Sequence, residues 1–165
     1  LLGLTLPVQI IIIPIFFQLK SIGLVNTLWG VILVSVGLAL PFCIFLMRNT
    51  FKDLPNEIRE SAFIDGAGQW RTFISIMLPL AKPGLVAILI FTFMEIWNDF
   101  MLPLVLLLSD EKYTISLGLY FFQGEFATNN ALIFGGTLIS MIPSIIVYII
   151  FQRQLIEGMA AGSVK

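Results

Sequence analysis

The sequence predicts an all-α protein, a polytopic bundle of transmembrane helices. Of its 165 residues, 58% are hydrophobic and only 12% are charged, whereas a soluble domain is roughly 45–50% apolar and about 25% charged. The apolar residues are also grouped in long continuous blocks. They do not alternate in and out as the strands of a membrane barrel would, so we expect helices that cross a bilayer.

Four blocks reach the length of about 20 mostly apolar residues that a membrane span needs. We expect these spans over residues 1–19, 28–47, 84–108 and 131–151. The third span alone contains acids, Glu95 and Asp99. Because Leu1 already lies within an apolar run, we expect a fragment whose N-terminal spans are missing.

Positive charge predicts the orientation of the spans. The loop 48–83 and the tail 152–165 contain all but two of the nine Lys and Arg residues, Lys20 and Lys112 being the exceptions. The loop and the C-terminus should therefore be cytoplasmic, with 20–27 and 109–130 outside. Tyr113–Phe122 is aromatic and is either a short helix at the membrane interface or a lid over the outer mouth.

Composition excludes several other functions. The net charge of −1 provides no basic surface for nucleic acid. The chain has no histidine and a single cysteine, Cys43, which removes most zinc sites and any histidine-based triad. Cys43 lies in an apolar block and is interpreted as an inert buried residue. No phosphate-binding loop of the form G-x-x-x-x-G-K-[ST] occurs, so the chain is not itself an ATPase.

The loop 48–83 has structure of its own. Asn56 can cap a short helix on which Ile58 and Ala62 share one side. Gly66 is placed to end this helix, as a glycine just past a C-terminus often does. A second short helix is expected over Gln69–Met77.

A spaced motif in this loop resembles a family signature. Glu60-Ser61-Ala62 is followed after three residues by Gly66, and after nine more by Ile76-x-Leu78-Pro79. The pattern is similar to Glu-Ala-Ala, Gly and Ile-x-Leu-Pro in the membrane subunits of binding-protein-dependent ABC importers, with Ser61 in place of the first alanine. The resemblance implies that the segment 56–79 couples to an ATPase through Glu60, Ser61, Ala62, Asp65, Gly66, Ile76, Leu78 and Pro79.

Two further segments resemble the sugar-importer, maltose-type branch of that family. They are Trp97-Asn98-Asp99-Phe100 and the ending Gly158–Lys165, and Leu24–Thr27 is also similar to family members. The resemblance covers nearly the whole chain. Family members typically have six spans with the signature loop between the fourth and fifth, so the four spans here are expected to be the last four.

The resemblance implies a permease subunit without enzymatic activity or a cofactor of its own. Its expected partners are a second homologous permease, a peripheral ABC ATPase dimer, an extracytoplasmic solute-binding protein and the lipid of a bacterial or archaeal plasma membrane. The expected solute is a sugar or related carbohydrate. An amino acid or a polyamine is the alternative, and the sequence does not specify the compound.

The polar residues of the third span are the candidate solute pathway. Asn98 and Asp99 can hydrogen-bond sugar hydroxyls, Trp97 can stack on a sugar face, and Glu95 should face a cavity or a partner. The same side chains can instead tie helices together. Two other classes remain: an ion-coupled carrier using Glu95, which would transport without ATP, and a membrane enzyme using the Glu95–Asp99 pair, for which ligands are few.

Overall fold

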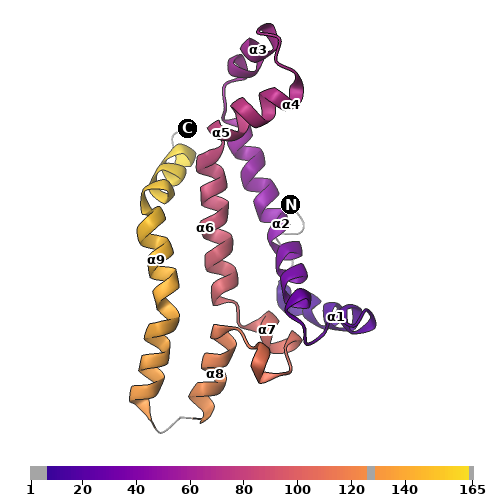
Figure 1. The fold of residues 1–165 in the computed structure, drawn as a ribbon, viewed down its shortest axis with the longest axis vertical. Coiled ribbons are helices and arrows are strands. Elements are labelled where there is room, and N and C mark those ends of the chain that lie inside the picture. Colours follow the sequence, from indigo (N-terminus) through magenta and orange to yellow (C-terminus); the bar gives the residue numbers. More distant parts are fainter. Residues whose placement is uncertain (1–6, 126–128, 164–165) are drawn as a thin grey trace.

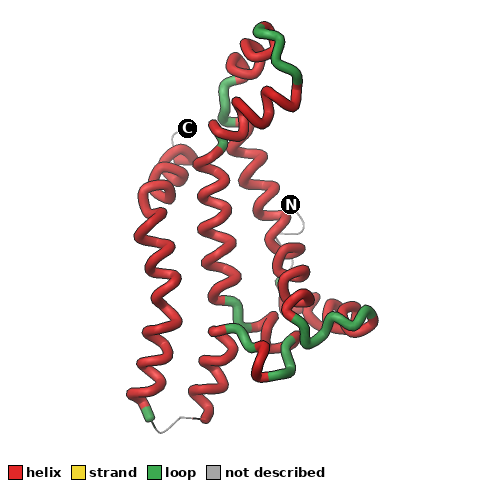
Figure 2. The backbone as a smooth tube through the Cα atoms, viewed as in Figure 1, coloured by secondary structure: helices red, strands yellow, loops and turns green. Residues whose placement is uncertain are grey.

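The computed structural model describes residues 7–125 and 129–163, and these residues contain helices and loops but no strand (Figure 2). The all-α prediction is therefore confirmed. Three long helices form the body of the molecule, namely α2 (Leu28–Lys52), α6 (Lys82–Asn98) and α9 (Asn130–Ser163). In Figure 1 they lie side by side with α6 in the middle, and α6 runs opposite to its two neighbours.

Two of these helices can cross a membrane by length and composition. They are α2 and the part of α9 up to Gln152. Helix α6 passes the same test only together with the helical segment Gln69–Leu80, from which it is bent by 65°. Helix α1 (Val8–Ser21) is apolar but shorter, and it projects sideways from the start of α2 (Figure 1).

Short elements cap the two ends of the long helices. At one end, here called the loop end, the chain forms α3 (Asn56–Ile64), α4 (Gln69–Thr72), a π-helix (Phe73–Met77) and α5 (Leu78–Leu80). The last described turn of α9 lies near this end (Figure 1). At the other end, the hairpin end, lie α7 (Met101–Leu106), a 3-10 turn (Asp110–Lys112) and α8 (Ile115–Glu125).

The prediction of a single helix over 84–108 is wrong. Helix α6 ends at Asn98, and α7 begins as a separate helix at Met101. The break has a local cause, because the Asp99 carboxylate accepts the backbone N–H groups of Met101 (3.1 Å) and Leu102 (3.4 Å) and so starts a new helix.

The other expected helices differ at their ends. Helix α9 does not stop at residue 151 but continues to Ser163. Helix α1 ends at Ser21, two residues beyond the expected span 1–19, and residues 1–6 of that span lie outside the described residues.

The tightest packing lies at the hairpin end. A buried cluster joins α1, α2, α7 and α8 through Ile12, Leu19, Val31, Leu102, Leu106, Leu107 and Leu117. The long helices, by contrast, expose much of their apolar surface; Phe134 on α9, for example, is 67% exposed. The hairpin end is thus the firmly packed part of this chain, while the sides of the long helices are free for lipid or other chains.

Most of the aromatic segment Tyr113–Phe122, for which an interfacial helix and a lid were both open, lies in helix α8, which packs antiparallel along the start of α9 (Figure 1). A Cβ on Gly136 would come within 3.1 Å of Leu119. Gly136 of α9 therefore faces α8 within the same chain. Beside α8, burial raises the pKa of the Tyr113 phenol above its ordinary 10.0, and its hydrogen bond to the Asp110 carboxyl adds to the rise.

Candidate functional site

The loop end presents α3 as a short amphipathic helix. Ala62 is buried and Ile58 half-buried, while Glu60 and Asp65 are exposed. The shared inner side of Ile58 and Ala62 is therefore confirmed. The expected cap by Asn56 is wrong, because the helix starts at Asn56 itself and no side chain caps it.

Gly66 ends α3 through its backbone conformation, as predicted. Its φ is +78°, in the left-handed region that side chains resist. The N–H of Gly66 donates to Phe63 O (3.0 Å), and the N–H of Ala67 donates to Ala62 O (2.9 Å). These two bonds form a Schellman motif, which satisfies the last carbonyls of the helix. A Cβ at Gly66 would meet nothing within 4 Å, so the conformation alone favours glycine.

Two large apolar side chains flank the Gly66 turn. Ile64 is 86% exposed and Trp70 is 77% exposed. Near them lie the exposed side chains of Glu60 and Asp65, while the Ser61 hydroxyl donates to Glu57 O (2.7 Å). Apolar groups at the tip of a polar loop are typical of a protein-binding surface.

The remaining motif residues form the base of this loop. Ile76 and Leu78 are half-buried, and Pro79 is exposed. They lie in the helical segment that leads into the 65° bend before α6. The helical segment Gln69–Leu80 connects the tip of the loop to the start of α6.

The predicted pathway residues lie around the end of α6, where two of them make structural contacts. Trp97 Nε1 donates to Ser140 O of α9 (3.1 Å), and its ring stacks on Phe93 with centroids 5.5 Å apart. Asp99 starts α7 and accepts a 2.6 Å hydrogen bond from Ser116 Oγ at its backbone oxygen. Trp97 and Asp99 therefore connect α6 to its neighbours.

The other two predicted residues are less constrained. Asn98 is exposed, and its amide donates to Met94 O one turn back in the same helix (2.7 Å). Glu95 is exposed on the face of α6 that turns toward α1 and α2. Of the four, Glu95 is the best placed to meet a ligand.

A cavity of about 220 Å³ adjoins Glu95 and gathers polar groups from three helices. Gln9 of α1 and Ser35 of α2 line it together with Glu95 and Asp99 of the α6 end. Ser35 is only 9% exposed, and among the described residues its hydroxyl has no hydrogen-bond partner. Sequence reasoning missed Gln9 and Ser35, although each is an isolated polar residue in an apolar block.

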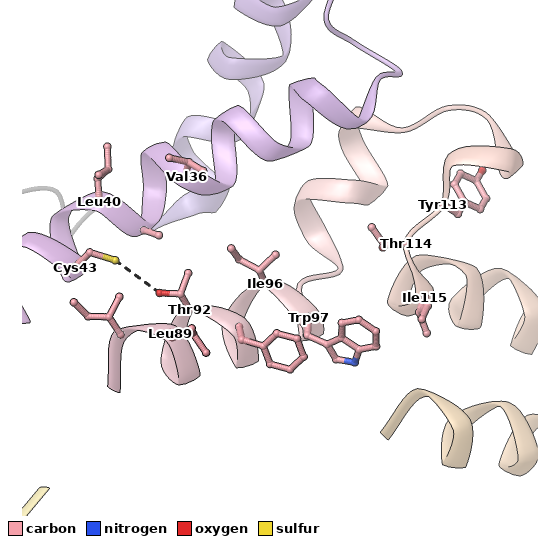
Figure 3. A pocket seen from close by; sticks show the side chains of 13 residues that line it. Val36, Leu40, Cys43, Leu89, Thr92, Ile96, Trp97, Tyr113, Thr114 and Ile115 are labelled. Carbon is pink, nitrogen blue, oxygen red and sulfur yellow. Dashed lines mark hydrogen bonds between the residues drawn. The ribbon is translucent and has the colours of Figure 1, made fainter. Parts of the chain in front are cut away.

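A larger cavity of about 740 Å³ lies between α2 and α6 and is lined mainly by apolar side chains (Figure 3). Leu40 and Leu89 are typical of its wall, and Cys43 Sγ lies 3.7 Å from Thr92 Oγ1. Cys43 is half-buried, not fully buried as expected. This cavity offers few hydrogen-bond partners, whereas the smaller cavity is lined by Gln9, Ser35, Glu95 and Asp99. The described residues contain no cluster of three potential metal ligands.

The fold defines a helical membrane protein in which a structured polar loop, at the loop end, connects the two apolar helices α2 and α6. Residues 1–159 match the family described as "Binding-protein-dependent transport system inner membrane component", and the chain belongs to this family. The resemblance noted in the loop motif is thereby confirmed.

Similar proteins are named as sugar permeases. The chain is 39% identical over its full length to the diacetylchitobiose uptake system permease protein NgcG of Streptomyces coelicolor, of which it covers 55%. It is 36% identical to the multiple sugar-binding transport system permease protein MsmG of Streptococcus mutans, again over the full chain and 60% of the relative. The chain thus spans little more than half the length of these relatives.

A solved structure agrees with the fold. The chain is similar to a subunit of a bacterial ABC transporter involved in the import of the acidic polysaccharide alginate, with a TM-score of 0.67 and 28% identity. The match covers 86% of this chain and 55% of that one.

Proposed function

We propose that this chain is part of a permease subunit of an ATP-driven importer, and that the solute is a sugar or related carbohydrate. The main support for this proposal is the signature loop. It folds as a short helix that ends in a left-handed glycine turn, and the side chains of Ile64 and Trp70 are exposed beside this turn. The named relatives, which are sugar permeases, support the solute class.

The proposed partners follow from the two ends of the molecule. A peripheral ATPase dimer binds the loop end in the cytoplasm, where Glu60 offers a carboxylate for a charge-assisted hydrogen bond. The C-terminus lies on the same side. A second, homologous permease completes the pathway, and a solute-binding protein docks at the outer, hairpin end. ATP hydrolysis takes place in the separate ATPase.

We place the solute pathway at the break between α6 and α7. Trp97 bonds Ser140, which lies about ten residues along α9, or about 15 Å from its start. We place the outer face of the hydrocarbon core, which is about 30 Å thick, at the start of α9, and this puts the break about halfway through it. Irregular backbone at that depth is tolerated where it is buried in protein or lines a wet cavity, and interrupted helices often form transporter sites. Glu95 and Asp99, with Gln9 and Ser35, line this pathway.

The division of roles among the predicted residues follows from their contacts. Trp97 serves as a tie between α6 and α9, and Asn98 is bonded within its own helix. Glu95 carries the interaction with solute hydroxyl groups. An ion-coupled carrier would instead use Glu95 to bind the coupling ion and would import solute without ATP. Transport by the purified complex in vesicles that lack ATP distinguishes the two functions.

The coupling role is tested at two glycines of one turn. Gly66→Val forces a side chain into φ +78°, whereas Gly68 has φ −69° and ψ 162°, which valine adopts readily. Both positions have open space around the added side chain. Gly66→Val should insert and bind loaded binding protein, but it should lose ATPase association or hydrolyse ATP without transport. Gly68→Val is the matched control and should retain transport.

Charge reversal provides a second test. Glu60→Lys should weaken ATPase association in the same assay, because it replaces the proposed acceptor with a cation. If Glu60→Lys assembles and transports normally, Glu60 has no coupling role. If Gly66→Val also does so, the loop is not the coupling element.

A further inference from the structure

Asn26 adopts a backbone conformation that side chains rarely take. Its φ is +58°, and it is the single non-glycine residue with positive φ in the described part of the chain. It lies in the turn between α1 and α2, directly before Thr27, which caps α2 by accepting the N–H of Gly30 (3.0 Å). A residue held in this region is kept there by its surroundings.

The surroundings of Asn26 are a segment more than 80 positions further along the chain. The amide oxygen accepts the backbone N–H groups of Leu108 (3.0 Å) and Ser109 (3.1 Å), and the amide nitrogen donates to Ser109 Oγ (2.7 Å). Its backbone N–H donates to Leu106 O (2.7 Å), and its backbone oxygen accepts from Lys112 Nζ (2.7 Å). Every polar atom of Asn26 is thus bonded to the segment 106–112.

This segment leads by a short route to the break at the end of α6. Four residues after Lys112, the Ser116 hydroxyl donates to the backbone oxygen of Asp99 (2.6 Å). The same Asp99 starts α7 with its carboxylate. Next to these bonds lie fully buried leucines, with Leu106 at 0% and Leu102 at 1% exposure. Asn26 and Asp99 therefore belong to one hydrogen-bonded and closely packed block.

We infer that Asn26 is a positioning residue for transport: it joins the α1–α2 turn to segment 106–112 and so holds the α6–α7 break in place. The inference rests on the proposed function, because the break is the proposed pathway. Asn26 acts through segment 106–112, Ser116 and Asp99, and it does not touch the solute. The block it closes carries both walls of the polar cavity, Gln9 and Ser35 on one side and Glu95 on the other.

The test compares two substitutions of Asn26 in the whole permease complex reconstituted with ATPase and binding protein. Asn26→Gly permits the positive φ but removes all three side-chain hydrogen bonds. Asn26→Asp retains the acceptor for Leu108 and Ser109, and the Ser109 hydroxyl can turn to donate to it. Ser21→Ala is the matched control, because the Ser21 hydroxyl bonds only Gln18 O of its own helix.

We expect Asn26→Gly to lower the maximal import rate by about tenfold or more, as the loss of several hydrogen bonds implies. The concentration of loaded binding protein at half-maximal import should stay unchanged, and ATP hydrolysis should continue, so more ATP is used per solute. Asn26→Asp should restore most of the import rate. Damage to the outer surface alone would instead raise the half-maximal concentration.

Normal import by Asn26→Gly would overturn the inference, as would a loss that Asn26→Asp does not restore. If Asn26→Gly fails to assemble, Ser109→Ala decides, since it removes a single bond: a lowered maximal rate supports positioning, and a normal rate refutes it. A wild-type complex that imports no carbohydrate would instead refute the proposed function, so the two failures are distinguishable.

Discussion

Helices α2 and α6 approach each other closely where Gly84 faces Thr50. A Cβ built on Gly84 would lie 2.7 Å from Thr50 Cγ2 and 2.9 Å from Thr50 Cβ, and nearer still to Thr50 Oγ1. Real Cβ atoms essentially never come within 3.0 Å of another heavy atom, so something must shift. Thr50 cannot turn away freely, because its hydroxyl donates to Leu46 O (3.0 Å).

The expected destabilisation by Gly84→Ala follows from two opposing terms. Overpacking of a close contact costs about 1–3 kcal/mol. Replacing glycine by alanine within a helix contributes about 0.5–1 kcal/mol in the other direction. The net loss in the free energy of unfolding should therefore lie between about 0 and 2.5 kcal/mol, with a midpoint of about 1 kcal/mol. Gly84 lies just after the bend that connects the signature loop to α6. A shift of α6 away from Thr50 should therefore also displace that loop.

Thermal unfolding of the purified complex in detergent measures this loss. Gly135→Ala on α9 is the matched control, since nothing lies within 4 Å of its added Cβ, and it should be neutral or slightly stabilising. Thr50→Ala removes two of the three close atoms and should partly rescue Gly84→Ala, with a coupling energy of about 1 kcal/mol in a double-mutant cycle. Equal stability of the Gly84 and Gly135 variants, or zero coupling, would refute the close approach.

Three further predictions concern the membrane helices. Trp97→Phe keeps the ring stacked on Phe93 but removes the hydrogen bond to Ser140 O. It should lower the stability of the complex by about 0.6–1.7 kcal/mol in the same unfolding assay. An unchanged stability would show that this hydrogen bond contributes nothing. Glu95→Ala should lower transport while assembly stays intact, whereas Asn98→Ala should leave transport near normal because that amide bonds only its own helix; the reverse result would move the solute contact to Asn98. A cysteine at Gln69 should react only with reagents on the cytoplasmic side, and one at Thr128, outside the described residues, only from the outer side; reaction of both from one side would break the proposed topology.

Local signals in the sequence predicted the loop end well. Gly66 follows an amphipathic run, and this combination is sufficient to place the end of α3 within a residue. The apolar blocks likewise predicted α2 and most of α9. The break at Asp99 was missed because Met101–Leu108 continues the apolar run of α6, and hydropathy alone does not register a helix that stops and restarts. The Asn98-Asp99 pair ahead of Pro103 is the signal that could have shown it, since Asp is a preferred residue before a helix start.

The contacts made by Asn26 show what no local signal can supply. Asn26-Thr27 before an apolar block predicts a capped helix start, but not that the Asn26 amide bonds Leu108, Ser109 and their neighbours across the fold. The same holds for Ser35 and Gln9, whose meeting with Glu95 depends on how α1 and α2 cross α6. The sequence presents Glu95, Trp97, Asn98 and Asp99 as one candidate pathway, whereas their contacts separate them. Trp97 and Asp99 use their polar groups to hold helices, whereas the Glu95 side chain is exposed, which supports our proposal that Glu95 contacts the solute.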